Sequence, residues 1–319
     1  MHALDFPAMV AEREILPQHV TARDFRLADL RLQRSPFTLV LSVVVVSADS
    51  GAGLRECVAS VLKSELALEL ILVDNDSQDG MPEAIERAHQ NDDRLRVIYN
   101  RANLGFGAAV NIGARAAHGE SLLILNPDCV LGAGDLEKLL SHLEDEVKPG
   151  LVGAVVCDAA GRPDPASWRH DPLFGRALKT LFGAGRGGVA VNGPIPGQAV
   201  AAEAVSGAVM LLPRLLFQRL GGFDEGYFLH CEDLDLCRRV RDEGYPVRLA
   251  GDVRVLHGKG GSSRHRPVFV SRWKHRGMWR WFRKFDPAAR NPLLASLVWL
   301  GIWSHFVLKV PTQLLRRRS

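Results

Sequence analysis

Acidic side chains follow two of the apolar runs in this chain. Asp74 and Asp76 close the run "LELILVDND", and Asp128 follows "SLLILN" after Pro127. A carboxylate at the end of a buried strand can bind Mg²⁺ or Mn²⁺ together with the phosphates of a substrate. Aspartate also caps turns and helix starts, so this spacing alone leaves a purely structural role open.

A second group of acids lies later in the chain, in "LHCEDLDLCRRVRDEG". Glu232, Asp233 and Asp235 fall within four residues at the start of an expected helix. Acids in a first helical turn complement the helix dipole, which is the structural interpretation. Clustered carboxylates also raise one another's pKa values, and a carboxylate with a raised pKa can act as a general base near neutral pH.

His257 ends the run "VRVLH" and precedes the glycine-rich stretch "GKGGSS". A single histidine is more often structural than functional. This one is followed by Gly258, Gly260 and Gly261, and a glycine backbone can approach a diphosphate closely. Both interpretations of His257 stay open on this pattern alone.

The elements that would position these side chains alternate between strands and helices. We expect strands at 39–47, 68–76, 95–100 and 121–126, and helices at 53–64, 82–89 and 105–119. The run "LVLSVVVVS" is too continuous for a half-exposed strand and is typical of a buried parallel one. The alternation predicts an α/β protein with a doubly wound, mostly parallel sheet, which would bind ligands at the carboxyl ends of its strands.

Three segments are expected along the chain. Residues 1–37 would form an N-terminal extension, 38–263 the α/β domain, and 264–319 a basic, aromatic set of helices. Within the α/β domain, Gly- and Pro-rich stretches between 162 and 198 are typical of loops or a mobile flap.

Composition limits the class and the compartment of the protein. Of 319 residues, 47% are hydrophobic and 24% charged, which excludes wholesale disorder. The five cysteines are odd in number and form no C-x-x-C pair, which argues against a disulfide framework or structural zinc. The first twenty residues hold no apolar run of signal-peptide length. We therefore expect the protein in the cytosol or on the cytoplasmic face of a membrane.

The end of the chain has a different character from the rest. From Arg264 onward, 13 Lys and Arg residues accompany one acid, Asp286. The stretch "RWKHRGMWRWFRKF" interleaves bases with aromatics, as membrane-interface and nucleic-acid-binding segments do. The apolar run 293–310, with Trp299 and Trp303, favours a helix lying in the cytoplasmic leaflet, and no nucleic acid is expected. A full span, or a helix packed on the body or on a second subunit, are the alternatives; oligomeric state cannot be read from the sequence.

Six motifs between residues 39 and 262 occur in an order that resembles a known family. They are "LSVVVVSADS", "LILVDNDSQDG", "NRANLGFGAAVNIGARAAHGE", "LLILNPDCVL", "VSGAVMLLPRLLFQRLGGFDEGYFLHCEDLDLCRRVRDEGY" and "VRVLHGKGGSS". This set resembles glycosyltransferase family 2, the inverting GT-A sugar transferases, and in particular its rhamnosyltransferase-like bacterial members.

The resemblance implies a role for each acidic position. Asp74 matches the acid that reads the base of a nucleotide-sugar, and Asp128 the metal-binding aspartate of the family's D-x-D element. His257 matches a histidine that completes metal coordination in some members. Asp233 matches the catalytic base, with Glu232 beside it. The nucleotide-sugar side of the pocket would also include Ser47, Asp49, Asn103, Gly105, Asn111 and Asn126.

The implied activity is metal-dependent transfer of a sugar, with rhamnose as one candidate, in the synthesis of a cell-surface polysaccharide. The donor would be a dTDP- or UDP-sugar, the ion Mg²⁺ or Mn²⁺, and the acceptor a glycan or a lipid-linked glycan. Two positions depart from the family's pattern: Asn126 replaces the first acid of D-x-D, and Ala48 stands where a tyrosine is common. A relative that binds nucleotide-sugars without catalysis, as a scaffold or binding module, is the alternative.

Overall fold

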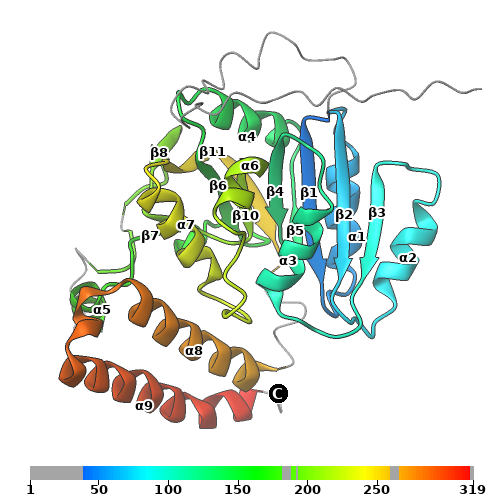
Figure 1. The fold of residues 1–319 in the computed structure, drawn as a ribbon. Helices are drawn as coiled ribbons and strands as arrows, with labels where there is room; N and C mark the ends of the chain where they lie inside the picture. Colours follow the sequence, from blue (N-terminus) through cyan, green and yellow to red (C-terminus); the bar gives the residue numbers. More distant parts are fainter. Residues whose placement is uncertain (1–38, 182–187, 192, 259–265, 317–319) are drawn as a thin grey trace, which may run out of the picture. The chain divides into compact units, whose positions relative to one another are not determined.

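The described part of the chain is built on one large sheet (Figure 1). The computed structural model describes residues 39–181, 188–191, 193–258 and 266–316. The N-terminal extension expected at 1–37 and most of the glycine-rich loop after His257 therefore lie outside the described residues. Residues 38–319 form one compact unit. The division expected after residue 263 stays a prediction.

Helices and strands alternate through this unit. The strands are β1 Leu41–Ser47, β2 Leu68–Asp74, β3 Leu95–Tyr99, β4 Ser121–Leu125, β5 Cys129–Val130, β6 Leu151–Cys157, β7 Trp168–Arg169, β8 Ala199–Ala201, β9 Ala204–Val205, β10 Val209–Pro213 and β11 Val247–His257. The helices are α1 Gly53–Leu62, α2 Met81–Ala88, α3 Phe106–Arg115, α4 Asp135–Glu144, α5 Phe174–Leu181, α6 Arg214–Arg219, α7 Glu232–Asp242, α8 Pro267–Phe285 and α9 Pro292–Arg316. In the part of the chain that the structure describes, 3₁₀ turns cover Pro165–Ser167 and Pro287–Arg290.

The strand order of the sheet changes direction at β1: β2 and β3 lie on one side of it, and β4 lies on the other. In the described residues its order is β3-β2-β1-β4-β10-β6-β11-β5, and β8 pairs with β11. Strands β1 to β4 pair with one another in parallel, whereas β10 is antiparallel to both β4 and β6. Because β2 and β4 lie on opposite sides of β1, the carboxyl ends of these strands border the crevice in which such sheets bind ligands. The expected doubly wound, mostly parallel sheet is confirmed.

The strongest strand prediction, β1, is buried along its whole length. Its side chains alternate between the two faces of the sheet. Val43 and Val45 join a core with residues of α1 and α4, whereas Val44 and Val46 join a second core with residues of α3 and α7. Helices cover both faces, which is why the run has no polar alternation.

The segment expected to be loop contains more regular structure than its composition predicted. Residues 162–181 form a 3₁₀ turn, strand β7 and helix α5, and β7 pairs with β9. Asp164 starts the 3₁₀ turn by accepting a hydrogen bond from the backbone N–H of Ala166. The Gly- and Pro-rich composition therefore marks closely spaced short elements here, while residues 182–187 and 192 lie outside the described part.

The two C-terminal helices pack on each other. His275 of α8 and His305 of α9 approach to 2.9 Å between Nε2 and Nδ1. On the other side, Gly277 of α8 faces the turn before α7: a Cβ there would lie 2.8 Å from the carbonyl oxygen of His230. Helix α8 therefore contacts both α9 and the segment that carries Glu232 and Asp233.

Candidate functional site

Asp128 and His257 meet at the carboxyl edge of the sheet. Strand β5 pairs antiparallel with the end of β11, in a register that sets Cys129 opposite His257. This pairing brings Asp128 Oδ1 to 3.1 Å from His257 Nε2. The Asn126 amide nitrogen lies 3.2 Å from the same ring nitrogen, and the Gly258 N–H donates to the Asp128 carbonyl. Three side chains expected around a metal and the diphosphate of the donor are thus adjacent.

The donor set at this corner fits a divalent cation. Two cis ligands of an octahedral ion with bonds of about 2.1 Å lie about 3 Å apart, close to the separation of Asp128 Oδ1 and His257 Nε2. Cys129 also lies within 4.8 Å of these ligand atoms. Its thiol is fully buried, however, and that burial holds its pKa well above the usual range. A carboxylate suits Mg²⁺ or Mn²⁺ better than a thiol does, and the Cys129 side chain is part of the hydrophobic core, so Asp128 and His257 are the pair suited to an ion.

Asp74 lies at the end of β2, next to the end of β1. It is nearly buried, and one carboxylate oxygen accepts a hydrogen bond of 3.0 Å from the Ser77 N–H. Burial raises its pKa above the ordinary value, against those hydrogen bonds. The Ser47 hydroxyl lies 3.3 Å from that of Ser77, and Asp49 accepts a hydrogen bond from the Gln78 N–H. Ser47 and Asp49 therefore hold the loop that follows Asp74.

Asn75 connects Asp74 to the next part of the predicted pocket. Its amide nitrogen donates to Asn103 Oδ1 at 3.1 Å and to the Gly105 carbonyl at 3.3 Å, and its oxygen accepts from the Leu104 N–H. Gly105 has φ 89°, and a Cβ there would lie 2.6 Å from the Phe228 carbonyl, so only glycine fits. Sequence reasoning missed Asn75, although a polar residue directly after Asp74 in an apolar strand was a usable signal.

Asn111 is turned toward a different segment. It is buried on α3, and its amide nitrogen donates to the Phe223 carbonyl at 2.9 Å and to Glu225 at 3.0 Å. Its oxygen accepts from the Phe223 N–H at 2.8 Å. The structure does not bring this side chain together with the other predicted residues; its amide instead fixes the segment that leads to α7.

Glu232 and Asp233 begin α7 in a strained backbone. The two residues before them, His230 and Cys231, both have left-handed φ values, 68° and 70°. Such a conformation costs about 1–2 kcal/mol for a residue with a side chain. Asp233 Oδ2 accepts hydrogen bonds from Arg169 at 2.5 Å and from the Gly207 N–H at 3.1 Å. The buried Glu232 Oε2 has no hydrogen-bond partner among the described residues.

The two carboxylates carry opposite pKa shifts. Burial, and then the charge of Asp233, raise the pKa of Glu232. Burial also acts upward on Asp233, but the Arg169 guanidinium and the hydrogen bonds from Leu234 and Gly207 outweigh it, so the pKa of Asp233 is lowered. The rise expected from clustered acids therefore falls on Glu232. Sequence reasoning missed Arg169, which nothing in its Pro-rich segment distinguishes from other arginines.

One short segment joins the carboxylate pair to the Asp128 corner. Gly207 donates its N–H to Asp233, and the next residue, Ala208, accepts a hydrogen bond of 2.9 Å from the Asn126 N–H. Both groups are thus tied to the backbone just before β10. A substrate phosphate at Asp128 and a reacting hydroxyl at Asp233 could lie on either side of this segment.

The chain is similar to sugar transferases in sequence. Residues 42–184 match the model of glycosyl transferase family 2. The N-acetylglucosaminyl-diphospho-decaprenol L-rhamnosyltransferase of Mycobacterium tuberculosis is 30% identical over 302 residues, covering 81% of this chain and 93% of that protein. Rhamnosyltransferase WbbL of Escherichia coli is 22% identical over 249 residues, covering 67% and 92%.

Solved structures show the same fold at lower identity. The mannosyltransferase PcManGT of Pyrobaculum calidifontis, in complex with GDP-Man and Mn²⁺, aligns with a TM-score of 0.56 at 19% identity over 88% of this chain and 74% of that one. Residues 1–349 of TarS from S. aureus align with a TM-score of 0.52 at 15% identity, over 85% and 81%. At these identities the likeness concerns the fold alone.

Proposed function

Since the chain belongs to glycosyl transferase family 2, with the GT-A-type fold expected from its motifs, we propose that it transfers a sugar from a dTDP- or UDP-sugar to a glycan or lipid-linked acceptor. It is a rhamnosyltransferase-like glycosyltransferase, and rhamnose is the first donor sugar to test. The acceptor class follows from the Mycobacterium tuberculosis relative, whose name describes a lipid-linked diphosphate sugar. Such a reaction belongs to cell-surface polysaccharide synthesis.

The single observation that carries this proposal is the joint placement of two charged groups. The Asp128–His257 pair lies at the carboxyl edge of the sheet, and the Ser206–Ala208 segment links it to Asp233. A transferase needs a cation site for the leaving diphosphate and a base for the acceptor, and these two groups match both needs.

Asp128 and His257 would hold Mg²⁺ or Mn²⁺ with the donor's phosphates, and Asn126 would lie beside them. The bound ion supplies charge neutralisation on the departing diphosphate. Asp74, buried at the end of β2, would accept hydrogen bonds from the pyrimidine base, with Ser47, Asp49, Asn103 and Gly105 shaping the loops around it. Asn111 binds the segment before α7 and would lie farther from the nucleotide-sugar than the other residues predicted for this pocket.

Asp233 would act as the base. The acceptor oxygen would bond to the anomeric carbon as the bond from that carbon to the diphosphate oxygen breaks, and the hydroxyl proton would pass to Asp233. The Arg169 ion pair keeps Asp233 ionised before the reaction and orients its second oxygen. Inversion follows because one displacement occurs on the face opposite the leaving group.

The experiment that tests this function measures transfer and donor hydrolysis by the full chain. dTDP-rhamnose and UDP-sugars are compared with and without Mn²⁺, for the wild type and for Asp233→Asn. We expect the variant to lose about 10²–10⁴-fold in turnover while its donor affinity, measured by calorimetry, changes little. Unchanged turnover would remove Asp233 from the mechanism. Nucleotide-sugar binding with neither transfer nor hydrolysis in the wild type would support a binding module instead.

We place the protein on the inner face of the cell membrane. Within α9 the stretch Pro292–Leu314 is long and apolar enough to cross a bilayer, and 6% of it is buried. Its pairing with α8 through His275 and His305 favours a hairpin lying along the surface over a span. Residues 317–319, which hold the last two of the three terminal arginines, lie outside the described part.

A further inference from the structure

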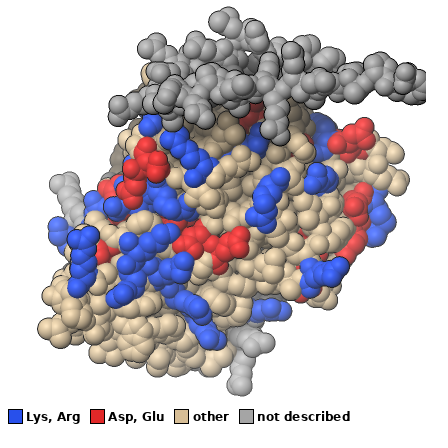
Figure 2. All heavy atoms as spheres, in the orientation of Figure 1, with Lys and Arg blue, Asp and Glu red and all other residues tan. Residues whose placement is uncertain are grey.

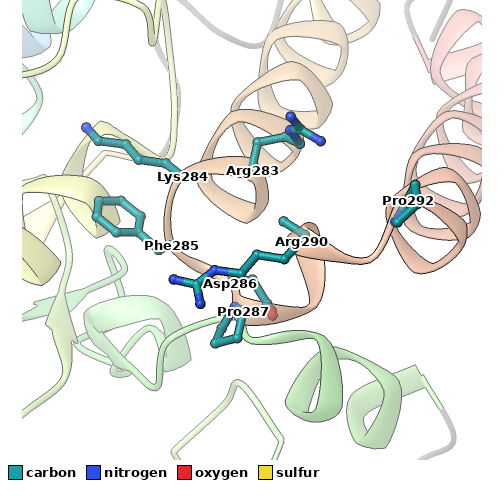
Figure 3. Close-up of a pocket in the computed structure, with 8 residues that line it drawn as sticks. Arg283, Lys284, Phe285, Asp286, Pro287, Arg290 and Pro292 are labelled. Atoms are coloured by element: carbon teal, nitrogen blue, oxygen red, sulfur yellow. The ribbon is translucent and has the colours of Figure 1, made fainter.

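A cavity of about 540 Å³ opens where α8 gives way to α9. The last turn of α8, the 3₁₀ turn Pro287–Arg290 and the first residue of α9 enclose it (Figure 3). Three cationic side chains line it, those of Arg283, Lys284 and Arg290, together with one acid, Asp286.

The charges around this cavity are not equally available. The Lys284 ammonium is bound to Asp224 at 2.8 Å and to Asp235 at 2.6 Å. Asp286 is buried, and its carboxylate accepts hydrogen bonds from the backbone N–H groups of Phe174 and Ala288. Arg283 and Arg290 are exposed, and within the described residues neither has an ion-pair partner. The Arg283 guanidinium lies 5.7 Å from the centroid of the Trp279 ring, and no hydrogen bond to another described residue occupies it or the Arg290 guanidinium, so both can bind an anion.

An aromatic groove continues from the cavity. A second hollow of about 300 Å³ shares Arg283 with the first and is bounded by Trp279 of α8 and Trp299 of α9. Beyond it, Leu293 and Leu297 on α9 are 76% and 62% exposed. Figure 2 shows the same pattern at larger scale, with Lys and Arg gathered over α8 and a surface almost free of charge over α9.

We propose that this junction binds anionic phospholipid headgroups in a bilayer, with Arg283 and Arg290, whose side chains point to different sides of the junction (Figure 3), each on a phosphate, and with the Trp279–Trp299 groove against the adjoining glycerol and upper acyl chain. Guanidinium groups bind phosphate oxygens in bidentate fashion, and tryptophan prefers the depth of the headgroups. A free phosphate or a nucleic acid would leave the leucines of α9 exposed to water, whereas a leaflet buries them. The inference rests on the proposed membrane location and adds a defined headgroup site to it.

The test measures binding of the full chain to vesicles by co-sedimentation. Vesicles of phosphatidylcholine alone are compared with vesicles containing one part in three of phosphatidylglycerol. The site variant is Arg283→Gln with Arg290→Gln, and its matched control is Arg272→Gln with Arg276→Gln, which removes the same charge from exposed positions of α8 outside the cavity. A diffuse charge effect weakens binding about fivefold for each arginine in both variants. We expect the site variant to lose at least tenfold more affinity than the control, on the phosphatidylglycerol vesicles.

Equal losses in the two double variants would overturn the site. So would saturation of the cavity by inorganic phosphate at millimolar concentration, seen as abolished vesicle binding, because a free anion would then be a sufficient ligand. A concentration-dependent dimer that forms without vesicles and is lost in the site variant would assign the groove to a second copy and also overturn it. Donor hydrolysis without vesicles should be the same in all variants, so failure of the lipid site is distinguishable from failure of the transferase function.

Discussion

At the scale of single residues, the protein gives two adjacent carboxylates different charges. The buried Oε2 of Glu232 has no hydrogen-bond partner among the described residues, whereas Oδ2 of Asp233 is bound to Arg169 and to a backbone N–H. The neutral form is favoured for Glu232 and the ionised form for Asp233. One carboxyl group of the pair is thus held neutral and the other ionised. Arg169, 64 residues away in the chain, makes Asp233 the ionised one.

Arg169→Gln should therefore move the pH profile of the reaction. Without the guanidinium the pKa of Asp233 rises, so the acidic limb of kcat/KM should shift to higher pH. Arg162→Gln removes an exposed arginine whose partner is Asp158 and should leave the limb in place. A uniform loss of rate at every pH, with the limb unmoved, would mean that Arg169 only supports the fold.

Glu232→Gln tests the other member of the pair through stability. Because the folded-state pKa of Glu232 is raised, the folded protein binds more protons than the unfolded chain above about pH 4.5, and stability is lost as pH rises through the folded pKa. Glutamine has no titrating carboxyl group, so the Glu232→Gln variant does not lose this stability as the pH rises. We expect the variant to melt about 3 °C above the wild type at pH 8 and to match it near pH 4.5. The same Tm difference at both values would exclude a titrating Glu232.

At the scale of elements, helix α8 supports the strained turn before the catalytic pair. The left-handed residues His230 and Cys231 aim the first turn of α7, and Gly277 lets α8 approach them closely. A Cβ at Gly277 would lie 2.8 Å from the His230 carbonyl oxygen and 3.2 Å from Cys231 Cβ. The surface helix and the proposed active site are thus in direct contact.

Gly277→Ala should therefore harm both stability and turnover. The added methyl group must displace the turn or the helix, at a cost of about 1–3 kcal/mol in the free energy of unfolding. Gly301→Ala is the matched control, since Gly301 is also helical and a Cβ there meets nothing within 4 Å; it should be neutral or stabilising by up to about 1 kcal/mol. Urea unfolding and turnover without vesicles measure both effects. Equal outcomes for the two variants would contradict the contact.

Elements with a long, continuous apolar pattern could be predicted from the sequence. Very short strands and contacts between residues far apart in the chain could not. Strand β1 is predictable because its apolar run is continuous, and Asp128 because it ends such a run. The meeting of Asp128 with His257 was not derivable from local pattern, since it depends on the two-residue strand β5. The helical spacing of the four buried leucines in α4 was present in the sequence, yet no element was assigned there. The Arg169 ion pair is a tertiary contact with no local signal.

At the scale of the whole molecule, charge and apolar surface are concentrated in the last helices. From residue 264 onward bases outnumber acids 13 to 1, while acids outnumber bases in the rest. Helix α9 exposes leucines along its length, whereas its His305 side faces α8. An interfacial helix has this division between a packed side and an apolar outer side.

The exposed leucines on the outer side of α9 should contribute to membrane binding independently of the basic residues. Leu297→Ser with Leu300→Ser removes two side chains that are 62% and 57% exposed, so it costs the folded protein little in water. Insertion of two leucines into a leaflet is worth roughly 2–4 kcal/mol, so binding to phosphatidylglycerol vesicles should weaken by at least tenfold. Leu215→Ser, which removes an equally exposed leucine on α6, should bind as the wild type does. The remaining attraction in the double variant should be electrostatic and disappear at 0.5 M salt, where charges are screened. If the double variant binds normally and instead changes its oligomeric mass, the outer side of α9 is a protein interface and the membrane location is wrong.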